Sequence, residues 1–191
     1  MAKSSTKKTT RKNPVKALPW DHPAVLLSTW FGIGKLKFAP GTLGSLGALP
    51  VIAFVFGMTQ GHNLFLWLLV ATIIIFFAGL WASDFYSTHY GKKDPSEVVI
   101  DEVAGQMLAI TFITFDVGPH VTAPHVIFPY LIIFLFFRFF DIWKPWPCSL
   151  FETKYKGGLG IMLDDIMAAV YALTLFYAIA VALMLFFTFS S

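Results

Sequence analysis

The sequence predicts an all-α fold: a polytopic membrane helix bundle with about five spans and one short interfacial or re-entrant helix near the N-terminus. Of the 191 residues, 57% are hydrophobic and only 13% are charged. A soluble domain carries about twice that charged fraction. Several apolar stretches also approach the roughly 20 residues that a helix needs to cross a bilayer. These observations exclude an ordinary soluble domain.

The N-terminal segment is strongly basic, with six of the 14 Lys and Arg residues in its first 16 positions. We expect residues 1–18 to form a disordered cytoplasmic tail, followed by a single membrane-embedded domain over residues 19–191. Attraction to anionic lipid headgroups explains the basic tail more simply than binding to nucleic acid, so no nucleic-acid partner is expected. The apolar stretch 24–31 is too short to span and gives the predicted interfacial or re-entrant helix.

Five longer apolar stretches follow in order. The first runs from about 40 to 56, after a Pro-Gly turn, and its glycines favour close packing against another helix. The stretch 64–81 is the clearest span, and its polar continuation is able to extend the same helix to residue 90. The third and fourth spans occupy about 98–115 and 126–137, and the fifth runs from about 161 to 187.

The distribution of basic residues orients these spans. With the basic tail inside and the spans alternating, the outside segments are 57–63, 116–125 and the C-terminus. None of the 14 Lys and Arg residues lies in them, as the positive-inside rule requires. Ten of the 11 acidic residues also lie inside, and Asp116 is the exception. We therefore expect the N-terminus to be cytoplasmic and the C-terminus to lie outside.

This topology brings four polar clusters to the cytoplasmic boundary. They are Pro-Gly-Thr-Leu-Gly-Ser at 40–45, the pair Asp101 and Glu102, the segment from Arg138 through Asp141 to Lys144, and a Gly-rich stretch at 157–165 that ends in Asp164 and Asp165. Arg138 and Asp141 are three residues apart and share a helix face. Pro145 and Pro147 then end that helix near the membrane surface.

The acidic pairs have two interpretations. Asp101 and Glu102, like Asp164 and Asp165, are predicted in the first turns of their helices, where the helix dipole favours carboxylates. Capping therefore explains each pair taken alone. Together with Asp141, however, five carboxylates converge at one depth and would repel one another without a cation. Oxygen ligands with no histidine or cysteine nearby favour Mg²⁺.

The basic residues point to an anionic ligand beside that metal. Arg138 can hold two phosphate oxygens at once, and Lys144 adds a point charge. Thr42 follows the Pro-Gly turn at a helix start, where its hydroxyl can cap the helix or bind phosphate. The alternative without a ligand, for the segment 138–147, is an aromatic belt in which tryptophans and a snorkelling lysine anchor a span at the membrane surface.

Two other function classes stay open at this point. A transporter or channel for a phosphorylated or charged solute would also place charges and Gly-broken helices in the membrane. Against it, the ionisable residues lie at one boundary and not at the midplane. A structural subunit that binds anionic lipid would need the basic residues but not five grouped carboxylates.

Four motifs resemble the phosphatidylglycerophosphatase A family of bacterial membrane proteins. They are GIGKLKFAPGTLGSLGALP at 32–50, VIDEVAG at 99–105, FRFFDIWKPWP at 137–147 and GGLGIMLDD at 157–165. The resemblance implies Mg²⁺-dependent hydrolysis of phosphatidylglycerophosphate to phosphatidylglycerol and phosphate, in phospholipid biosynthesis. It further implies a multi-pass protein of the bacterial inner membrane with a cytoplasmic active site and a lipid substrate in the bilayer. No obligate protein partner is inferred.

The resemblance carries the site residues over position by position: Asp101, Glu102, Arg138, Asp141, Lys144, Asp164 and Asp165 as catalytic residues, with Thr42, Arg138 and Lys144 toward the phosphate. We hypothesise that the five carboxylates hold Mg²⁺, which orients a water, while Arg138 and Lys144 stabilise charge on the phosphoryl group. Glu102 or Asp165 then acts as general base, or one aspartate attacks directly and forms a phosphoaspartate. Both routes stay open.

Overall fold

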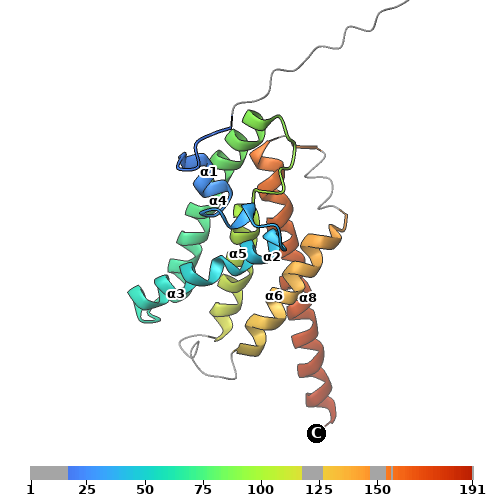
Figure 1. The fold of residues 1–191 in the computed structure, drawn as a ribbon. Coiled ribbons are helices and arrows are strands. Elements are labelled where there is room, and N and C mark those ends of the chain that lie inside the picture. The colour runs from blue at the N-terminus through green and yellow to red at the C-terminus, as the bar shows by residue number, and fades with distance from the viewer. Residues whose placement is uncertain (1–16, 118–126, 147–153, 156, 191) are drawn as a thin grey trace, which may run out of the picture.

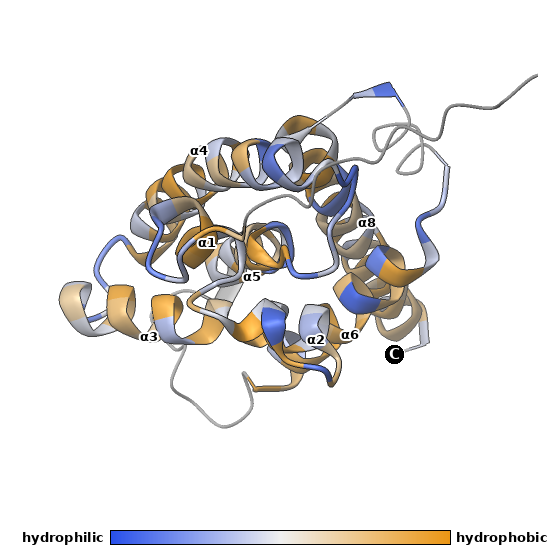
Figure 2. Ribbon diagram, turned by 45° about the horizontal axis from the view of Figure 1, so that its top comes forward, coloured by the Kyte–Doolittle hydropathy of each residue, from blue (hydrophilic) through white to orange (hydrophobic). Residues whose placement is uncertain are grey.

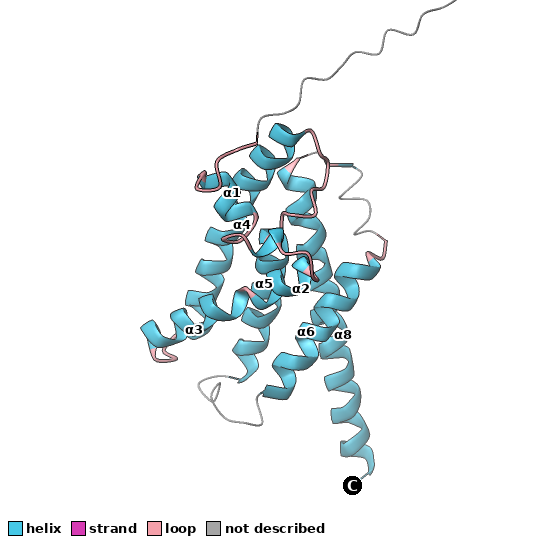
Figure 3. Ribbon diagram, in the orientation of Figure 1, coloured by secondary structure: helices cyan, strands magenta, loops and turns pink. Residues whose placement is uncertain are grey.

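The computed structural model describes residues 17–117, 127–146, 154–155 and 157–190, and within these ranges the chain forms helices and loops without a strand (Figures 1 and 3). In chain order the elements are α1 (Pro23–Ser28), the 3₁₀ helix η1 (Ile33–Lys35), α2 (Pro40–Leu46), α3 (Ala48–Thr59), α4 (Leu64–Tyr90), α5 (Ile100–Val117), α6 (Ile127–Trp143) and α8 (Gly158–Ser190). The predicted all-α class is confirmed. The predicted disordered tail falls almost entirely outside the described residues, as does most of the loop predicted at 116–125.

Three segments among the described residues are long and apolar enough to cross a membrane: α2 and α3 together (Pro40–Thr59), α4, and α8. Helix α6 has 17 residues, and α5 carries three carboxylates, so crossings by these two helices stay a prediction. Hydrophobic colour dominates the helices, and hydrophilic colour is found chiefly at helix ends and in loops (Figure 2). Helix α1 and the C-terminus lie at opposite ends of the bundle (Figure 1).

Helix α5 is the centre of the bundle and packs against α2, α3, α4, α6 and α8. Close approach to two of these helices depends on Gly105. A Cβ atom there would lie 2.6 Å from the ring of Phe137 on α6 and 2.8 Å from the backbone oxygen of Asp165 on α8. Small residues at membrane-helix contacts permit such packing. Gly105 thus allows the polar turn of α8 to lie directly beside α5.

The segment from α1 to α2 folds around the start of α5. The backbone N–H of Val99 donates to the carbonyl oxygen of Ser28 over 2.8 Å. A Cβ atom at Gly44 on α2 would lie 2.8 Å from the Cβ of Val99, so only glycine permits this contact. Helix α1 packs on α4. The glycine-rich motif at 32–50 therefore helps to place the first turn of α5.

Two predicted helix boundaries have different outcomes. The extension of the span at 64–81 to residue 90 is confirmed, since α4 ends at Tyr90 and Gly91 follows with φ 61°. The predicted start of the last span near residue 161 is wrong, because α8 begins at Gly158. Asp164 and Asp165 therefore lie beyond the first turn, and capping does not explain them. The carboxylate that serves the start of α8 is Asp84 of α4, whose Oδ1 accepts from the N–H of Gly158 over 3.1 Å.

Candidate active site

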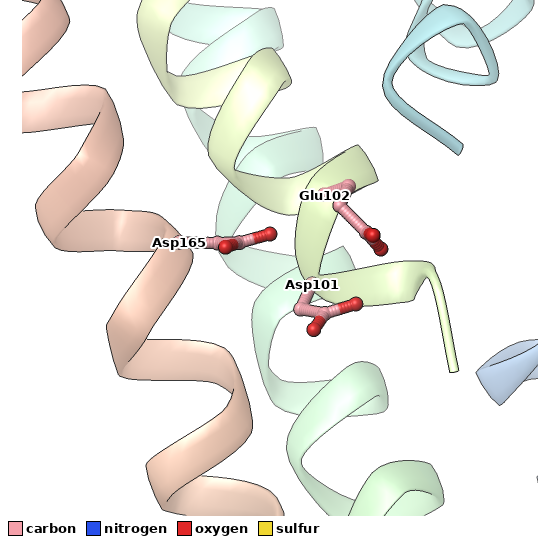
Figure 4. A group of neighbouring side chains, drawn as sticks. All are labelled: Asp101, Glu102 and Asp165. Atoms are coloured by element: carbon pink, nitrogen blue, oxygen red, sulfur yellow. The ribbon is translucent and has the colours of Figure 1, made fainter. Parts of the chain in front are cut away.

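Three of the predicted site residues form one acidic cluster. Asp101 and Glu102 come from the first turn of α5, and Asp165 reaches toward them from α8 (Figure 4). One carboxylate oxygen from each residue lies within 4.8 Å of the other two. The acidic cluster, as we call these three residues, thus joins Asp165 to two side chains that lie more than 60 positions earlier in the sequence.

The acidic cluster is enclosed and short of hydrogen-bond donors. Asp165 is only 3% exposed, and Asp101 and Glu102 are half-buried. Three of their oxygens are buried without a hydrogen-bond partner among the described residues: Asp101 Oδ1, Glu102 Oε2 and Asp165 Oδ2. Buried carboxylates without donors are costly unless a proton or a cation compensates them. The three carboxylates supply oxygen ligands close enough together to bind one divalent cation that prefers oxygen.

Arg138 and Asp141 form an ion pair within α6, on the helix face that their three-residue spacing predicts. The pair is largely enclosed, with side-chain exposures of 14% and 10%. Nη1 of Arg138 also donates to the hydroxyl of Ser45 on α2 over 3.2 Å, while Nε has no partner among the described groups. The carboxylate of Asp141 interacts in addition with that of Asp165. Arg138 thus lies beside the acidic cluster, with its Nε–H buried and unpartnered among the described groups.

Lys144, which directly follows α6, makes an ion pair with Asp164 of α8. Helix α6 ends at Trp143, and Lys144 follows with φ 46°, so the predicted spacing along one helix face is not continued. Burial lowers the pKa of Lys144, but the hydrogen bond and charge of Asp164 outweigh it and raise the pKa above its usual value. Lys144 therefore stays charged at neutral pH, and Asp164 is held apart from the acidic cluster.

Thr42 lies in the first turn of α2, half-buried. The helix is preceded by Ala39 in the capping position, so the predicted role of Thr42 as a cap is wrong. Its neighbour Gly41 explains why this turn is close to the site. A Cβ atom at Gly41 would lie 2.5 Å from Oε1 of Glu102 and 3.0 Å from Nη2 of Arg138.

Three further residues of the site were not predicted from sequence: Gly41, Ser45 and Gln106. Gly41 and Ser45 lie in the motif at 40–45. That motif indicated that the segment belongs to the site, but it did not indicate which side chains the segment contacts. Gln106 follows Glu102 by one turn, is fully buried, and both atoms of its amide lack partners among the described residues. A polar side chain within an apolar helix, four residues after an acidic one, was the available signal.

Comparisons with known proteins agree with this geometry. The family model described as Phosphatidylglycerophosphatase A matches residues 26–180. The phosphatidylglycerophosphatase A of Haemophilus influenzae is 34% identical over 170 residues, which cover 89% of this chain and 96% of that protein. The Escherichia coli K12 protein of the same name is 33% identical over 165 residues, with 85% and 86% covered.

A third relative carries a different name. A Bacteroides thetaiotaomicron protein named "Putative phosphatidylinositol-3-phosphatase" is 37% identical over 159 residues, which cover 83% of this chain and 92% of that protein. No solved structure matches the fold. The motifs, the site and the match over most of the chain lead to one conclusion: the chain belongs to the phosphatidylglycerophosphatase A family and is a phosphatase.

Proposed function

We propose that this protein is an Mg²⁺-dependent phosphatase that hydrolyses phosphatidylglycerophosphate to phosphatidylglycerol and phosphate. The observation that carries the proposal is the acidic cluster, three carboxylates from two helices within 4.8 Å, beside the ion-paired Arg138. The substrate is the one named for two relatives that match nearly the whole chain. The distribution of basic residues supports a cytoplasmic N-terminus and site, and the proposal includes a location in the inner membrane.

Asp101, Glu102 and Asp165 would hold the cation. When bound, Mg²⁺ neutralises the phosphate and activates the attacking group. The sequence hypothesis of five metal ligands is thereby narrowed to three, because Asp141 pairs with Arg138 and Asp164 pairs with Lys144. These two carboxylates are better placed to orient the cations than to bind metal.

The basic residues of the site bind and orient the phosphate. Arg138 has a planar fork of donors, of which Asp141 and Ser45 occupy one nitrogen and fix its direction. Lys144 contributes a charge from the other wall of the site, where Asp164 holds it. Hydrolysis forms a bond from a water oxygen to phosphorus and breaks the bond to the glycerol oxygen, which takes up a proton. Glu102 or Asp165, through a carboxylate oxygen that does not bind the cation, accepts the proton of the water and passes it to the glycerol oxygen.

The alternative route forms a phosphoaspartate, which water then hydrolyses. The two routes differ in one observable. Rapid quenching of the enzyme with radiolabelled substrate leaves label on the denatured protein only in the phosphoaspartate route. Peptide mapping of the labelled protein then identifies which carboxylate carries the label.

The Bacteroides relative supports a second candidate substrate, phosphatidylinositol 3-phosphate. Both lipids present a phosphate monoester to the same charged residues, so the headgroup beyond the phosphate distinguishes them. Membership of a family of phosphatases does not support the transporter or channel hypothesis, and the charged groups of the site face one another in ion pairs and in the acidic cluster.

Phosphate release from the purified protein in detergent tests the proposal. Phosphatidylglycerophosphate, phosphatidylinositol 3-phosphate and phosphatidate are offered separately, each with Mg²⁺ and after chelation by EDTA. We expect Mg²⁺-dependent release, fastest from phosphatidylglycerophosphate. Release that persists after EDTA treatment would contradict the metal assignment. Faster release from phosphatidylinositol 3-phosphate would replace the substrate and leave the phosphatase assignment in place.

A further inference from the structure

An apolar groove runs along the bundle beside the charged site. It has a volume of about 600 Å³ and lies between α3 and α6, next to α2. Ile110 and Thr114 of α5 and Leu64 of α4 are buried and form its floor, whereas Leu49 of α3 and Leu131 of α6 are half-exposed and form its rims. The groove is therefore open sideways, toward the hydrocarbon of the bilayer in which the helices lie.

The groove starts where the phosphate-binding groups end. Leu46, its first residue on α2, directly follows Ser45, which binds Arg138. On α6, Phe134 lines the groove and lies one turn before Arg138, on the same helix face. The α2 and α6 walls of the groove thus begin next to Ser45 and Arg138, which hydrogen-bond to each other beside the acidic cluster. The cavity between α3 and α4 has no lining residue on α2 or α6, and the cavity between α6 and α8 has none on α2.

The length of the groove fits one leaflet. On α6, the stretch from Arg138 to Ile127, at the far end of the groove, spans about 16 Å, at about 1.5 Å per helical residue. The hydrocarbon core of a bilayer is about 30 Å thick, so one leaflet measures about 15 Å. An acyl chain whose headgroup lies at Arg138 would therefore reach the far end of the groove near the middle of the bilayer. The lining is almost wholly apolar, and its polar members Thr114 and Tyr130 hydrogen-bond to each other over 3.2 Å.

We propose that this groove binds one acyl chain of the lipid whose phosphate lies at Arg138, and so sets the enzyme's preference for a membrane-embedded substrate. The inference rests on the proposed function, because that function places a lipid phosphate at the charged end. It adds a role for the lipid tail in substrate recognition. The substrate enters sideways from the leaflet, and its acyl chain in the groove positions the headgroup at the charged site.

Filling the groove tests the proposal. Ala53→Trp puts a large side chain into the groove from α3, and Leu131→Trp does so from α6. We expect either variant to raise the KM for dioleoyl phosphatidylglycerophosphate at least tenfold. Hydrolysis of the deacylated headgroup, glycerophosphoglycerophosphate, should stay within twofold of the unmodified protein. Ala182→Trp is the matched control, since Ala182 is exposed on α8 outside the groove, and it should change neither substrate.

A second measurement does not depend on turnover. The full-length protein is placed in nanodiscs that contain phosphatidylglycerophosphate with a photoreactive group in the middle of one acyl chain. After illumination, the labelled peptides of the protein are mapped. We expect labelling concentrated on residues 46–56 and 127–134 and its loss in Ala53→Trp. Equal labelling of the exposed face of α8 around Val181, or an unchanged KM in both groove variants, would overturn the inference. Absence of turnover with every lipid, together with labelled groove residues, would instead overturn the proposed function alone.

Discussion

The two acidic pairs of this protein look alike in sequence and differ in structure. Asp101 and Glu102 lie in the first turn of α5, and both enter the acidic cluster. Asp164 and Asp165 lie further along α8 and separate: Asp165 joins the acidic cluster, and Asp164 pairs with Lys144. Adjacent residues on a helix point about 100° apart. The α8 pair divides because Lys144 lies within reach of Asp164, whereas both members of the α5 pair lie within reach of Asp165.

The comparison has a chemical consequence. A helix start supplies a favourable dipole for Asp101 and Glu102, so part of their charge is stabilised without any cation. Asp165 has no such support, because α8 begins before it and Asp84 serves that end. Asp165 therefore depends most on a cation, and Asp164 has one already in Lys144.

The largest effect is expected from Asp165→Asn. The substitution keeps the shape of the side chain and removes the charge that faces α5. We expect kcat to fall by about 10³-fold, the upper part of the range for loss of one electrostatic stabiliser. Mg²⁺ titration of the activity measures whether the cation is still bound. Activity within threefold of the unmodified protein would remove Asp165 from the metal site.

A smaller effect is expected from Asp164→Asn. Lys144 then loses the carboxylate that fixes it, and activity should fall by about 10- to 100-fold, as for other residues that orient a binding group. The loss should appear mainly in KM. Lys144→Met should cost a similar amount, and the double variant should be no worse than Lys144→Met alone. Additive losses would show that the two residues act separately.

Gly41→Ala tests the contribution of the α5 pair, because Gly41 of α2 lies against Glu102. The new methyl group would meet Oε1 of Glu102 and the guanidinium of Arg138, two side-chain ends that can move aside. We therefore expect a folded protein with activity reduced by roughly tenfold, in the range for a displaced catalytic group. Gly57→Ala is the matched control, because nothing lies within 4 Å of a Cβ atom there. Equal activity of the two variants would mean that the contact at Gly41 is unimportant.

The sequence indicated which charged side chains gather at the candidate site, but not which of them pair with one another. The spacing of Arg138 and Asp141 predicted that they share a helix face, but Asp141 was assigned to the metal, and its ion pair with Arg138 was not predicted. The partner of Lys144 depends on where α6 ends and α8 begins. The Gly-rich stretch before Asp164 resembled a loop, and its helical start depends on Asp84, a residue of α4 more than 70 positions earlier. Contacts of that range are not visible in local patterns.

The smallest effect is expected at a second Lys–carboxylate pair, Lys92 and Glu97. Their atoms Nζ and Oε1 are 3.1 Å apart, and the side chains are 53% and 33% exposed. Exposed pairs contribute about 0.2–1 kcal/mol to the free energy of unfolding, because water competes for both groups. Asp164, in contrast, is 5% exposed in its pair with Lys144. Glu97→Gln should therefore leave activity within twofold and thermal unfolding nearly unchanged, measured beside Asp164→Asn. A loss at Glu97 as large as at Asp164 would mean that removal of any carboxylate near this end of the protein impairs it, whatever its burial.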